Sequence, residues 1–250
     1  MAAVLELPRL SETCEHALSL TQDYHGPAAK CPLHGDQTPA ERLDEWLLAM
    51  PRPSLDVERH VYSLGERVRP SVTEILVGTG IVDERWFTEY GRWRGSAVHQ
   101  VTWFDDEGDL DVDSVVDTEA FTRREVLGHL EGWRKFRRVT GFAPKAIERS
   151  VCHPTLGYAG TPDRVGVLGD GRLCLPDLKS GASSKATRYQ TVAYAACYPM
   201  PRLFVRMEVR TKANGDYTLQ TYGLECYQRD FANWQHLVAV FNLKKELRRL

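Results

Sequence analysis

The sequence of 250 residues suits one large domain, or one domain with a small extension. Hydrophobic residues make up 42% and charged residues 26%, as in ordinary globular proteins, and the absence of a long apolar run excludes a membrane-spanning class. The formal net charge of −2 neither favours nor excludes nucleic acid, because the distribution of charge matters more than its sum. The first residues lack the basic start and apolar stretch of a secretory signal, so we expect a cytoplasmic protein.

Residues 1–65 are predicted to form an N-terminal extension that is partly helical. A helix is expected over 39–50, because Thr38–Glu41 has a capping-box pattern with proline at the first helical position. Pro51 and Pro53 then end it.

Two Cys/His pairs in this extension are candidate zinc ligands of the kind used in structural sites. They are Cys14 with His16, and Cys31 with His34. The alternative is an irregular, solvent-exposed arm. The other cysteines are scattered at long spacings, and we expect buried free thiols for most of them.

Residues 66–250 are predicted to form the main domain, which begins with helices. Pro70–Glu74 repeats the capping pattern and opens a short helix that ends near Gly78 or Gly80. Asp83 is a candidate cap for a further helix. A helix over 92–104 is followed by an acidic stretch expected to be a loop, and a long amphipathic helix covers 118–139, with Gly141 past its end.

Beyond this helix the pattern changes to short β-branched or alternating segments separated by turn residues. Strands are expected over 145–152, 158–168, 172–178, 201–210 and 217–223, and helices over 183–198 and from 228. Gly169-Asp170-Gly171 is a strong hairpin signal. The order predicts an α/β or α+β fold with a mixed central sheet flanked by helices.

Asp163, Asp177 and Lys179 carry the clearest chemical signal. The predicted hairpin places Asp163 in one strand and Asp177 in its antiparallel neighbour, so the two carboxylates lie close together. Such a pair repels itself unless a cation intervenes, and hard oxygen ligands suit Mg²⁺ or Mn²⁺. Lys179 shares a strand face with Asp177. The alternative is two plain surface acids, since an Asp-x-Lys triplet arises by chance about once in a chain of this size.

Two neighbouring segments strengthen the functional interpretation. Gln190 and Tyr194 share one face of the helix that follows Lys179, although Tyr194 is also a candidate core residue. Upstream, His99 follows small residues that would let its helix approach the sheet closely, which would allow a nitrogen ligand.

Taken together, these segments resemble the PD-(D/E)XK nuclease superfamily, and within it the RecB-like exonuclease branch. The resemblance covers about residues 70–225. The matching motifs, in order, are Arg94-Gly-Ser-Ala-Val-His99, Gly157-Tyr-Ala-Gly-Thr-Pro-Asp163, Asp177-Leu-Lys179-Ser-Gly181 and Gln190-Thr-Val-Ala-Tyr194. The resemblance implies a restriction-endonuclease-like core and phosphodiester hydrolysis.

The resemblance also implies a metal site. Asp163 and Asp177 match the metal-binding acids, the main-chain carbonyl of Leu178 a further ligand, and His99 the additional ligand of the RecB-like branch. Glu148 stands where some relatives carry an acid, although it is equally a candidate for a strand-edge pair with its neighbour.

The remaining roles implied by the resemblance concern water and substrate. Lys179 matches the lysine that orients or activates the attacking water. Gln190 and Tyr194 match the helix motif that contacts substrate or steadies that lysine. The candidate phosphate contacts are Arg94, Ser180, Lys185 and Arg188. The candidates for base stacking, for which core packing is the alternative, are Trp93, Trp103, Trp133 and Tyr189.

The sequence therefore predicts a Mg²⁺- or Mn²⁺-dependent DNA exonuclease of phage DNA processing or of prokaryotic recombination and repair, with a recombinase or single-strand-annealing protein as a possible partner. The alternatives are a structure-specific endonuclease and a non-catalytic nucleic-acid-binding subunit of the same fold. RecB-like relatives in CRISPR adaptation bind an iron–sulfur cluster through three C-terminal cysteines. No cysteine follows Cys226 here, so no such cluster is expected.

Overall fold

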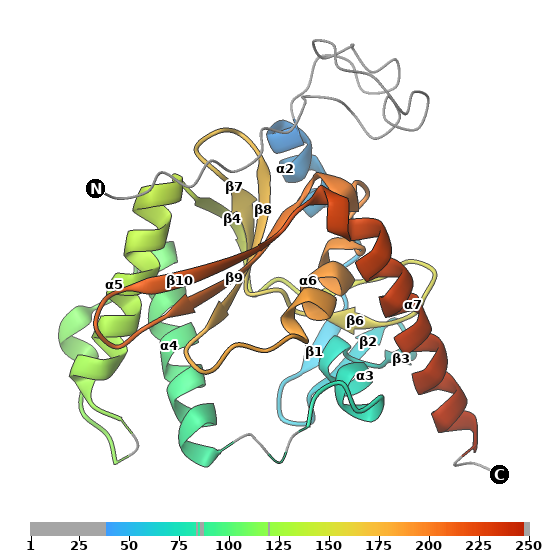
Figure 1. Ribbon diagram of the computed structural model, residues 1–250, viewed down its shortest axis with the longest axis horizontal. Helices are drawn as coiled ribbons and strands as arrows, with labels where there is room; N and C mark the ends of the chain where they lie inside the picture. The colour runs from blue at the N-terminus through green and yellow to red at the C-terminus, as the bar shows by residue number, and fades with distance from the viewer. Residues whose placement is uncertain (1–38, 84, 86–87, 120, 248–250) are drawn as a thin grey trace.

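The computed structural model describes residues 39–83, 85, 88–119 and 121–247 (Figure 1). The candidate zinc ligands Cys14, His16, Cys31 and His34 lie outside the described residues. In the part of the chain that is described, no helix combines the length and apolar character needed to cross a membrane.

A five-stranded sheet forms the centre of the molecule. Its strands, in spatial order, are β10 (Tyr217–Tyr222), β9 (Val205–Thr211), β8 (Leu173–Lys179), β7 (Arg164–Val167) and β4 (Ala143–Ile147). β8 and β9 run parallel, whereas the other neighbours are antiparallel. The predicted mixed central sheet is confirmed.

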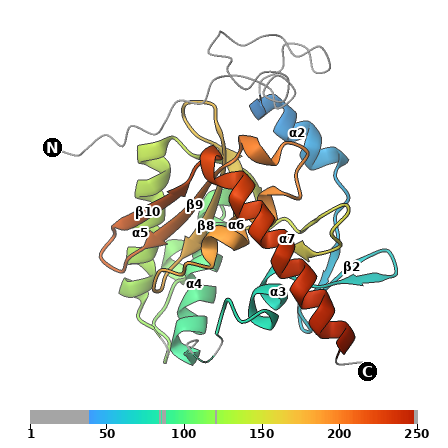
Figure 2. The same ribbon diagram turned by 45° about the vertical axis from the view of Figure 1, so that its right-hand side comes forward.

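Helices cover both faces of this sheet (Figure 1). One face packs against α4 (Glu89–Glu107) and α5 (Arg123–Thr140), with Trp133 and Leu178 in the shared core. The other face packs against α6 (Thr187–Ala195) and α7 (Leu224–Leu247), with Leu175 in that core. Because strand side chains alternate between faces, the neighbouring positions of β8 supply both cores. Figure 2 shows α7 crossing in front of α6 and α3 (Val72–Gly78).

Most helices lie where the sequence predicts them, but several begin or end at other residues than predicted. α2 covers Pro39–Ala49, and the predicted capping box of α3 is confirmed, because Ser71 and Glu74 make both reciprocal bonds. α5 ends at Gly141, which adopts a left-handed φ of 66°, as its glycine predicts. α6 and α7 start at Thr187 and Leu224 rather than at 183 and 228.

The predicted first and last residues of α4 and α5 are wrong. α4 begins at Glu89, because Thr88 caps it, and its last turn includes Asp105 and Asp106, which were expected in a loop. α5 begins at Arg123 rather than at 118, because Thr122 provides its cap. Between the two helices lies the short 3-10 turn η2 (Val112–Ser114), and a second such turn, η3 (Pro201–Leu203), precedes β9.

Two predicted strands are each divided in the structure. The segment 145–152 divides into β4 and β5 (Val151–Cys152), and 158–168 divides into β6 (Ala159–Gly160) and β7. The reason is local: β4 is irregular between Pro144 and Ala146, and Glu148 has a positive φ of 45°, which turns the chain. β5 and β6 then pair as a separate two-stranded sheet.

A small antiparallel sheet precedes α3, where the sequence predicts an irregular segment. It consists of β1 (Ser54–Asp56), β2 (Val61–Leu64) and β3 (Arg67–Arg69). Only Tyr62 is buried among the residues of these strands, so they lack the alternating pattern that predicts a half-buried strand. Tyr62 packs against Cys152 and Ala159 of the two-stranded sheet.

Candidate active site

Asp163 and Asp177 face each other across neighbouring strands. β7 and β8 pair Gly166 with Cys174 in antiparallel register, and continuing that register places Asp163 opposite Asp177. Asp163 lies one residue before β7, and its Oδ2 accepts a hydrogen bond of 2.6 Å from the main-chain N–H of Leu178. Both side chains are buried, and carboxylates are rarely buried unless a cation or a hydrogen-bond donor is paired with them.

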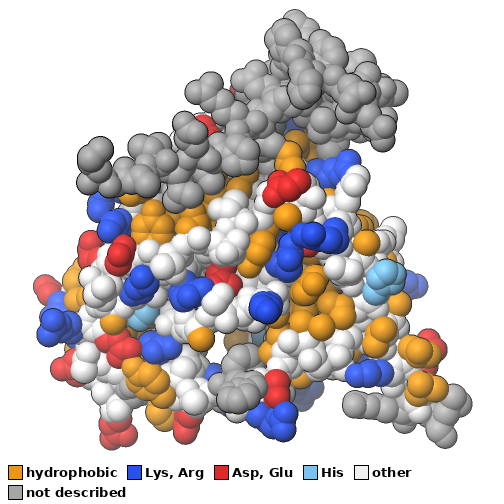
Figure 3. Space-filling view, in the orientation of Figure 1, with side chains coloured by type: hydrophobic (Ala, Val, Ile, Leu, Met, Phe, Trp, Pro, Cys, Tyr) orange, Lys and Arg blue, Asp and Glu red, His pale blue; other side chains and the backbone are white. Residues whose placement is uncertain are grey.

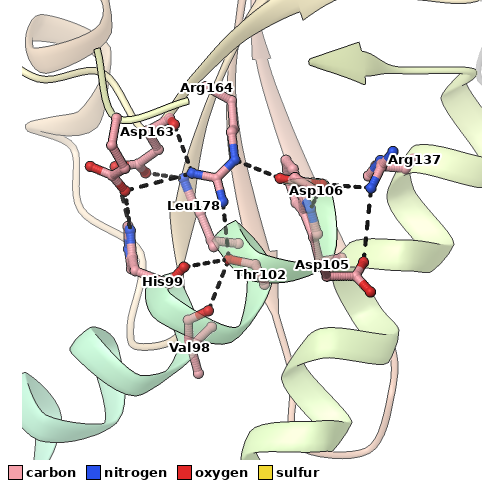
Figure 4. A network of polar contacts seen from close by, with 11 residues as sticks. Val98, His99, Thr102, Asp105, Asp106, Arg137, Asp163, Arg164 and Leu178 are labelled. Carbon is pink, nitrogen blue, oxygen red and sulfur yellow. Dashed lines mark hydrogen bonds and ion pairs between the residues drawn. The ribbon is translucent and has the colours of Figure 1, made fainter. Parts of the chain in front are cut away.

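His99 and Glu148 join Asp163 in a compact cluster. His99 Nδ1 lies 3.5 Å from Asp163 Oδ1 and 3.5 Å from Glu148 Oε1. One potential ligand atom from each residue lies within 4.8 Å of the other two. Figure 4 shows His99 of α4 directed at Asp163. One imidazole nitrogen and two carboxylates form a suitable partial ligand set for a divalent cation.

The backbone of Glu148 adopts a strained conformation. Its φ of 45° lies in the left-handed region, which costs a non-glycine residue on the order of 1 kcal/mol or more. The Glu148 N–H donates to the main-chain oxygen of Asp163 at 3.0 Å, and Arg164 Nη1 lies 3.6 Å from Glu148 Oε1. These contacts compensate the strain and keep the carboxylate beside Asp163.

Lys179 is held by a chain of polar contacts on the adjacent strand. Its Nζ lies 2.6 Å from Asp177 Oδ2 and donates to Gln190 Oε1 at 3.3 Å. Gln190 in turn donates from Nε2 to the hydroxyl of Tyr194 at 3.2 Å. The structure therefore brings together the predicted residues of β8 and α6.

Burial and neighbouring charges shift the pKa values of Asp177, Lys179 and His99. Burial raises the pKa of Asp177 to about 6, an effect that the Lys179 ammonium opposes and the Asp163 carboxylate reinforces. Burial lowers the pKa of Lys179, but Asp177 and Asp163 outweigh this and the net shift is upward. The pKa of His99 is likewise raised, because Asp163 and Glu148 outweigh the effect of burial. Lys179 is therefore an ammonium at neutral pH.

One buried oxygen in the site has no counterpart. Asp177 Oδ1 is inaccessible to solvent and has no hydrogen-bond partner among the residues that the structure describes. Buried acceptors are normally paired, and an orphaned carboxylate oxygen indicates a missing donor or cation. The donor chemistry of His99, Glu148 and Asp163 fits a divalent metal ion. Asp177, which the sequence also predicts as a ligand, is not part of this three-residue group in the described part of the chain.

The candidate substrate residues lie in different environments. Arg94 approaches the end of β8, since a Cβ on Gly181 would lie 3.5 Å from Arg94 Nη2, while Ser180 is half-buried and Lys185 exposed. Arg188 forms an ion pair of 3.1 Å with the buried Asp230, which indicates a structural contribution.

The four candidate stacking residues also differ in exposure. Trp133 is fully buried, so core packing accounts for it, and Tyr189 packs against the core. Trp93 and Trp103 are partly exposed, at 47% and 39%.

Sequence reasoning missed the network behind the cluster (Figure 4). Arg164 Nη1 donates to the main-chain oxygen of Asp163 at 2.7 Å, and Arg164 Nε binds Asp106 Oδ2. Asp106 also accepts hydrogen bonds from Arg137 and from Trp133 Nε1. The available signals were an arginine inside a short apolar strand and an aspartate at a helix C-terminus, where the helix dipole disfavours it.

Comparisons with known proteins add little to this geometry. No family model matches the sequence, and no curated protein matches it. An alkaline exonuclease (LHK-Exo) from Laribacter hongkongensis matches with a TM-score of 0.31 and 13% identity, over 72% of this chain and 92% of that chain. The structure of LHK-Exo in complex with dAMP matches with a TM-score of 0.30 and 14% identity, with the same coverage. A likeness at such TM-scores and identities does not assign a function to this chain.

Proposed function

We propose that this protein is a divalent-metal-dependent deoxyribonuclease of the PD-(D/E)XK type, in its RecB-like branch. The observation that carries the proposal is the meeting of His99, Glu148 and Asp163 in one cluster, beside the buried pair of Asp177 and Lys179. The order Pro162-Asp163 followed by Asp177-Leu-Lys179, which matches the family signature, supports it.

The proposed ligands of the ion are His99, Glu148 and Asp163, with Asp177 contributing its unpartnered oxygen and the main-chain carbonyl of Leu178 as a further candidate. Their oxygen-rich set fits Mg²⁺ or Mn²⁺. When bound, such an ion neutralises phosphate oxygens and lowers the pKa of a coordinated water. Arg164 holds the Asp163 main chain, and this contact keeps the carboxylate in place during turnover.

Lys179 acts as a cation in this proposal. Its raised pKa means that the ammonium donates hydrogen bonds rather than accepting a proton, so it orients the attacking water and stabilises charge that develops on the phosphate. Asp177 and Gln190 restrict its rotamers, and Tyr194 restricts Gln190. This ordering reduces the reorganisation needed in the transition state.

Substrate affinity would come mainly from phosphate contacts, with little base readout. Arg94, Ser180 and Lys185 are the proposed contacts, while the ion pair with Asp230 limits the contribution of Arg188. Lys and Arg side chains are spread over the face drawn in Figure 3 and interspersed with apolar ones, so no single basic patch on that face marks a path for DNA.

We further propose exonuclease action on DNA ends in recombination, repair or phage DNA processing, with a recombinase or single-strand-annealing protein as partner. This part rests on the sequence resemblance. The intact set of Asp163, Asp177 and Lys179 disfavours a non-catalytic subunit, because loss of one of them is what removes activity.

The decisive experiment is release of label from end-labelled linear DNA in Mg²⁺, Mn²⁺ or EDTA. Wild type is compared with Lys179→Ala and with Lys245→Ala, a matched change in the last turn of α7. We expect activity with either metal, none in EDTA, a loss on the order of 10²-fold or more for Lys179→Ala, and no change for Lys245→Ala. Activity in EDTA, or full activity of Lys179→Ala, would overturn the proposal.

A second substrate separates the two modes of cleavage. Circular single-stranded DNA has no end, so a strict exonuclease leaves it intact while degrading the same sequence after linearisation. Degradation of the circle would replace the exonuclease with an endonuclease.

A further inference from the structure

A chain of three hydroxyl groups joins β2 to the two segments that carry Glu148 and Asp163. The Tyr62 hydroxyl is 2.9 Å from Thr161 Oγ1, and Thr161 Oγ1 is 3.0 Å from Ser150 Oγ. Tyr62 belongs to β2 and is only 2% exposed, so its ring is fixed by packing. The chain therefore links the small N-terminal sheet to two segments of the candidate site.

These two segments carry the acids of the cluster. Ser150 follows Glu148 by two residues, and Thr161 precedes Asp163 by two residues. The segments are also joined by the bond from the Glu148 N–H to the Asp163 main-chain oxygen, and further on by pairing of Val151 with Gly160. The hydroxyl chain lies between these two connections.

The segment that carries Glu148 has particular need of such support. Its left-handed backbone is strained, and strained conformations persist only where the surroundings over-determine them. Removing one hydroxyl leaves the Val151–Gly160 pair intact, so the fold survives while the spacing of the two acids loosens. Metal affinity is more sensitive to such loosening than stability is, because ligand positions must match the ion closely.

We propose that Tyr62 is a positioning residue for Glu148 and Asp163 and that it acts through Thr161 and Ser150. The inference rests on the proposed function, because the spacing of these acids matters only if they hold a divalent ion. Tyr62 is not one of the proposed ligands, and its contribution is to their geometry.

The experiment is calorimetric titration of the full chain with Mn²⁺. Tyr62→Phe and Thr161→Val remove the chain at two points, whereas Thr161→Ser keeps the hydroxyl. Tyr158→Phe is the matched control, because Tyr158 is equally buried but donates its hydroxyl to the main-chain oxygen of Ala193 at 2.8 Å. We expect about tenfold weaker Mn²⁺ binding for Tyr62→Phe and Thr161→Val, and nearly wild-type binding for Thr161→Ser and Tyr158→Phe.

The outcomes separate this inference from the proposed function. Wild-type affinity in Tyr62→Phe, or an equal loss in Tyr158→Phe, overturns the inference, and if Mn²⁺ binding is still abolished by Asp163→Asn the proposed metal site stands. Absence of Mn²⁺ binding by the wild type overturns both. If Tyr62→Phe fails to fold, the comparison of Thr161→Val with Thr161→Ser decides, and equal affinities in that pair reject the inference.

Discussion

Arg164 and Asp106 form an ion pair in which both side chains are completely buried. The pair connects the last turn of α4 to the first residue of β7, and so to the main chain of Asp163. Burial of two charges is costly unless each is fully hydrogen-bonded. Here Trp133 and Arg137 donate further hydrogen bonds to the Asp106 carboxylate. Asp106, which the sequence predicts in a loop, is thus a buried residue at the end of α4 that supports the candidate site.

Asp106→Asn should therefore destabilise the fold strongly, because it removes the fully buried counter-charge of the Arg164 guanidinium and leaves only Glu148 at 3.6 Å. We expect a loss of about 3–5 kcal/mol in the free energy of unfolding, measured with urea. Asp170→Asn breaks the Arg172–Asp170 pair, in which the acid is 52% exposed, and should cost at most about 1 kcal/mol. Similar losses in the two variants would contradict a special role for the buried pair.

His99→Ala should weaken metal binding more than it weakens the fold. The imidazole belongs to one of the three clustered residues that could hold a metal ion, yet its side chain is 30% exposed, so its packing contribution is modest. We expect about tenfold or greater loss of Mn²⁺ affinity by calorimetry, with little change in the urea midpoint. His236→Ala on the exposed side of α7 is the control and should match wild type in both measurements. An unchanged titration for His99→Ala would assign this residue to packing.

His153 should make a contribution to stability that is lost in mild acid. Burial lowers its pKa to about 4, and its Nδ1 accepts hydrogen bonds from the main-chain N–H groups of Thr155 and Leu156. In the unfolded chain a histidine titrates near pH ~6.5, so between these values only the unfolded state binds the proton. The contribution of His153 is therefore full above that range and declines as the pH falls through it, by up to about 3 kcal/mol. Asp177, whose pKa is raised to about 6, changes stability in the opposite direction, so the His153 contribution is the difference between wild type and a variant that lacks it.

This pH dependence is measured by urea unfolding at several pH values between 7 and 4. His153→Asn keeps an acceptor but cannot titrate, so it should be less stable than wild type at neutral pH, and this difference should shrink as the pH falls toward 4. His236→Asn should follow the wild-type curve. Parallel curves for wild type and His153→Asn would show that another group is responsible.

Replacing Gly128 or Gly95 with alanine should change the stability of the fold in opposite directions. A Cβ at Gly128 of α5 would lie 1.8 Å from the main-chain oxygen of Ala213, so Gly128→Ala forces the β9–β10 turn away and should cost about 1–3 kcal/mol or more. At Gly95 of α4 the nearest atom is Ser180 Oγ at 4.0 Å, so Gly95→Ala should be neutral or stabilising by up to about 1 kcal/mol. Thermal unfolding distinguishes the two, and equal shifts would contradict the close packing at Gly128.

The parts of the site that sequence could predict are those set by local periodicity. Strand parity put Asp177 and Lys179 on one face, and the hairpin turn at Gly169–Gly171 put Asp163 across from Asp177. Helical spacing likewise aligned Gln190 with Tyr194. These relationships depend on residues close in the chain, which is why a single sequence contains them.

The other parts depend on contacts between distant segments. The position of Glu148 follows from a left-handed turn held by Asp163, and nothing in the local sequence requires a positive φ at a glutamate. Arg188 looked like a phosphate contact, yet Asp230 of α7 pairs with it. Tyr62 lies in strands too short to show a periodic pattern, so its contact with Thr161 was invisible before the fold was known.

The three clustered candidate ligands come from separate parts of the fold: His99 from α4, Glu148 from the residue after β4 and Asp163 from the residue before β7. An unfolded chain cannot assemble them, so a cation that occupies the cluster binds the native state alone. Thermodynamic linkage then makes the divalent ion a stabilising ligand, worth about 2.7 kcal/mol at a concentration one hundred times its dissociation constant. The melting temperature should rise with Mn²⁺, return to its starting value with EDTA, and stay constant in Asp163→Asn.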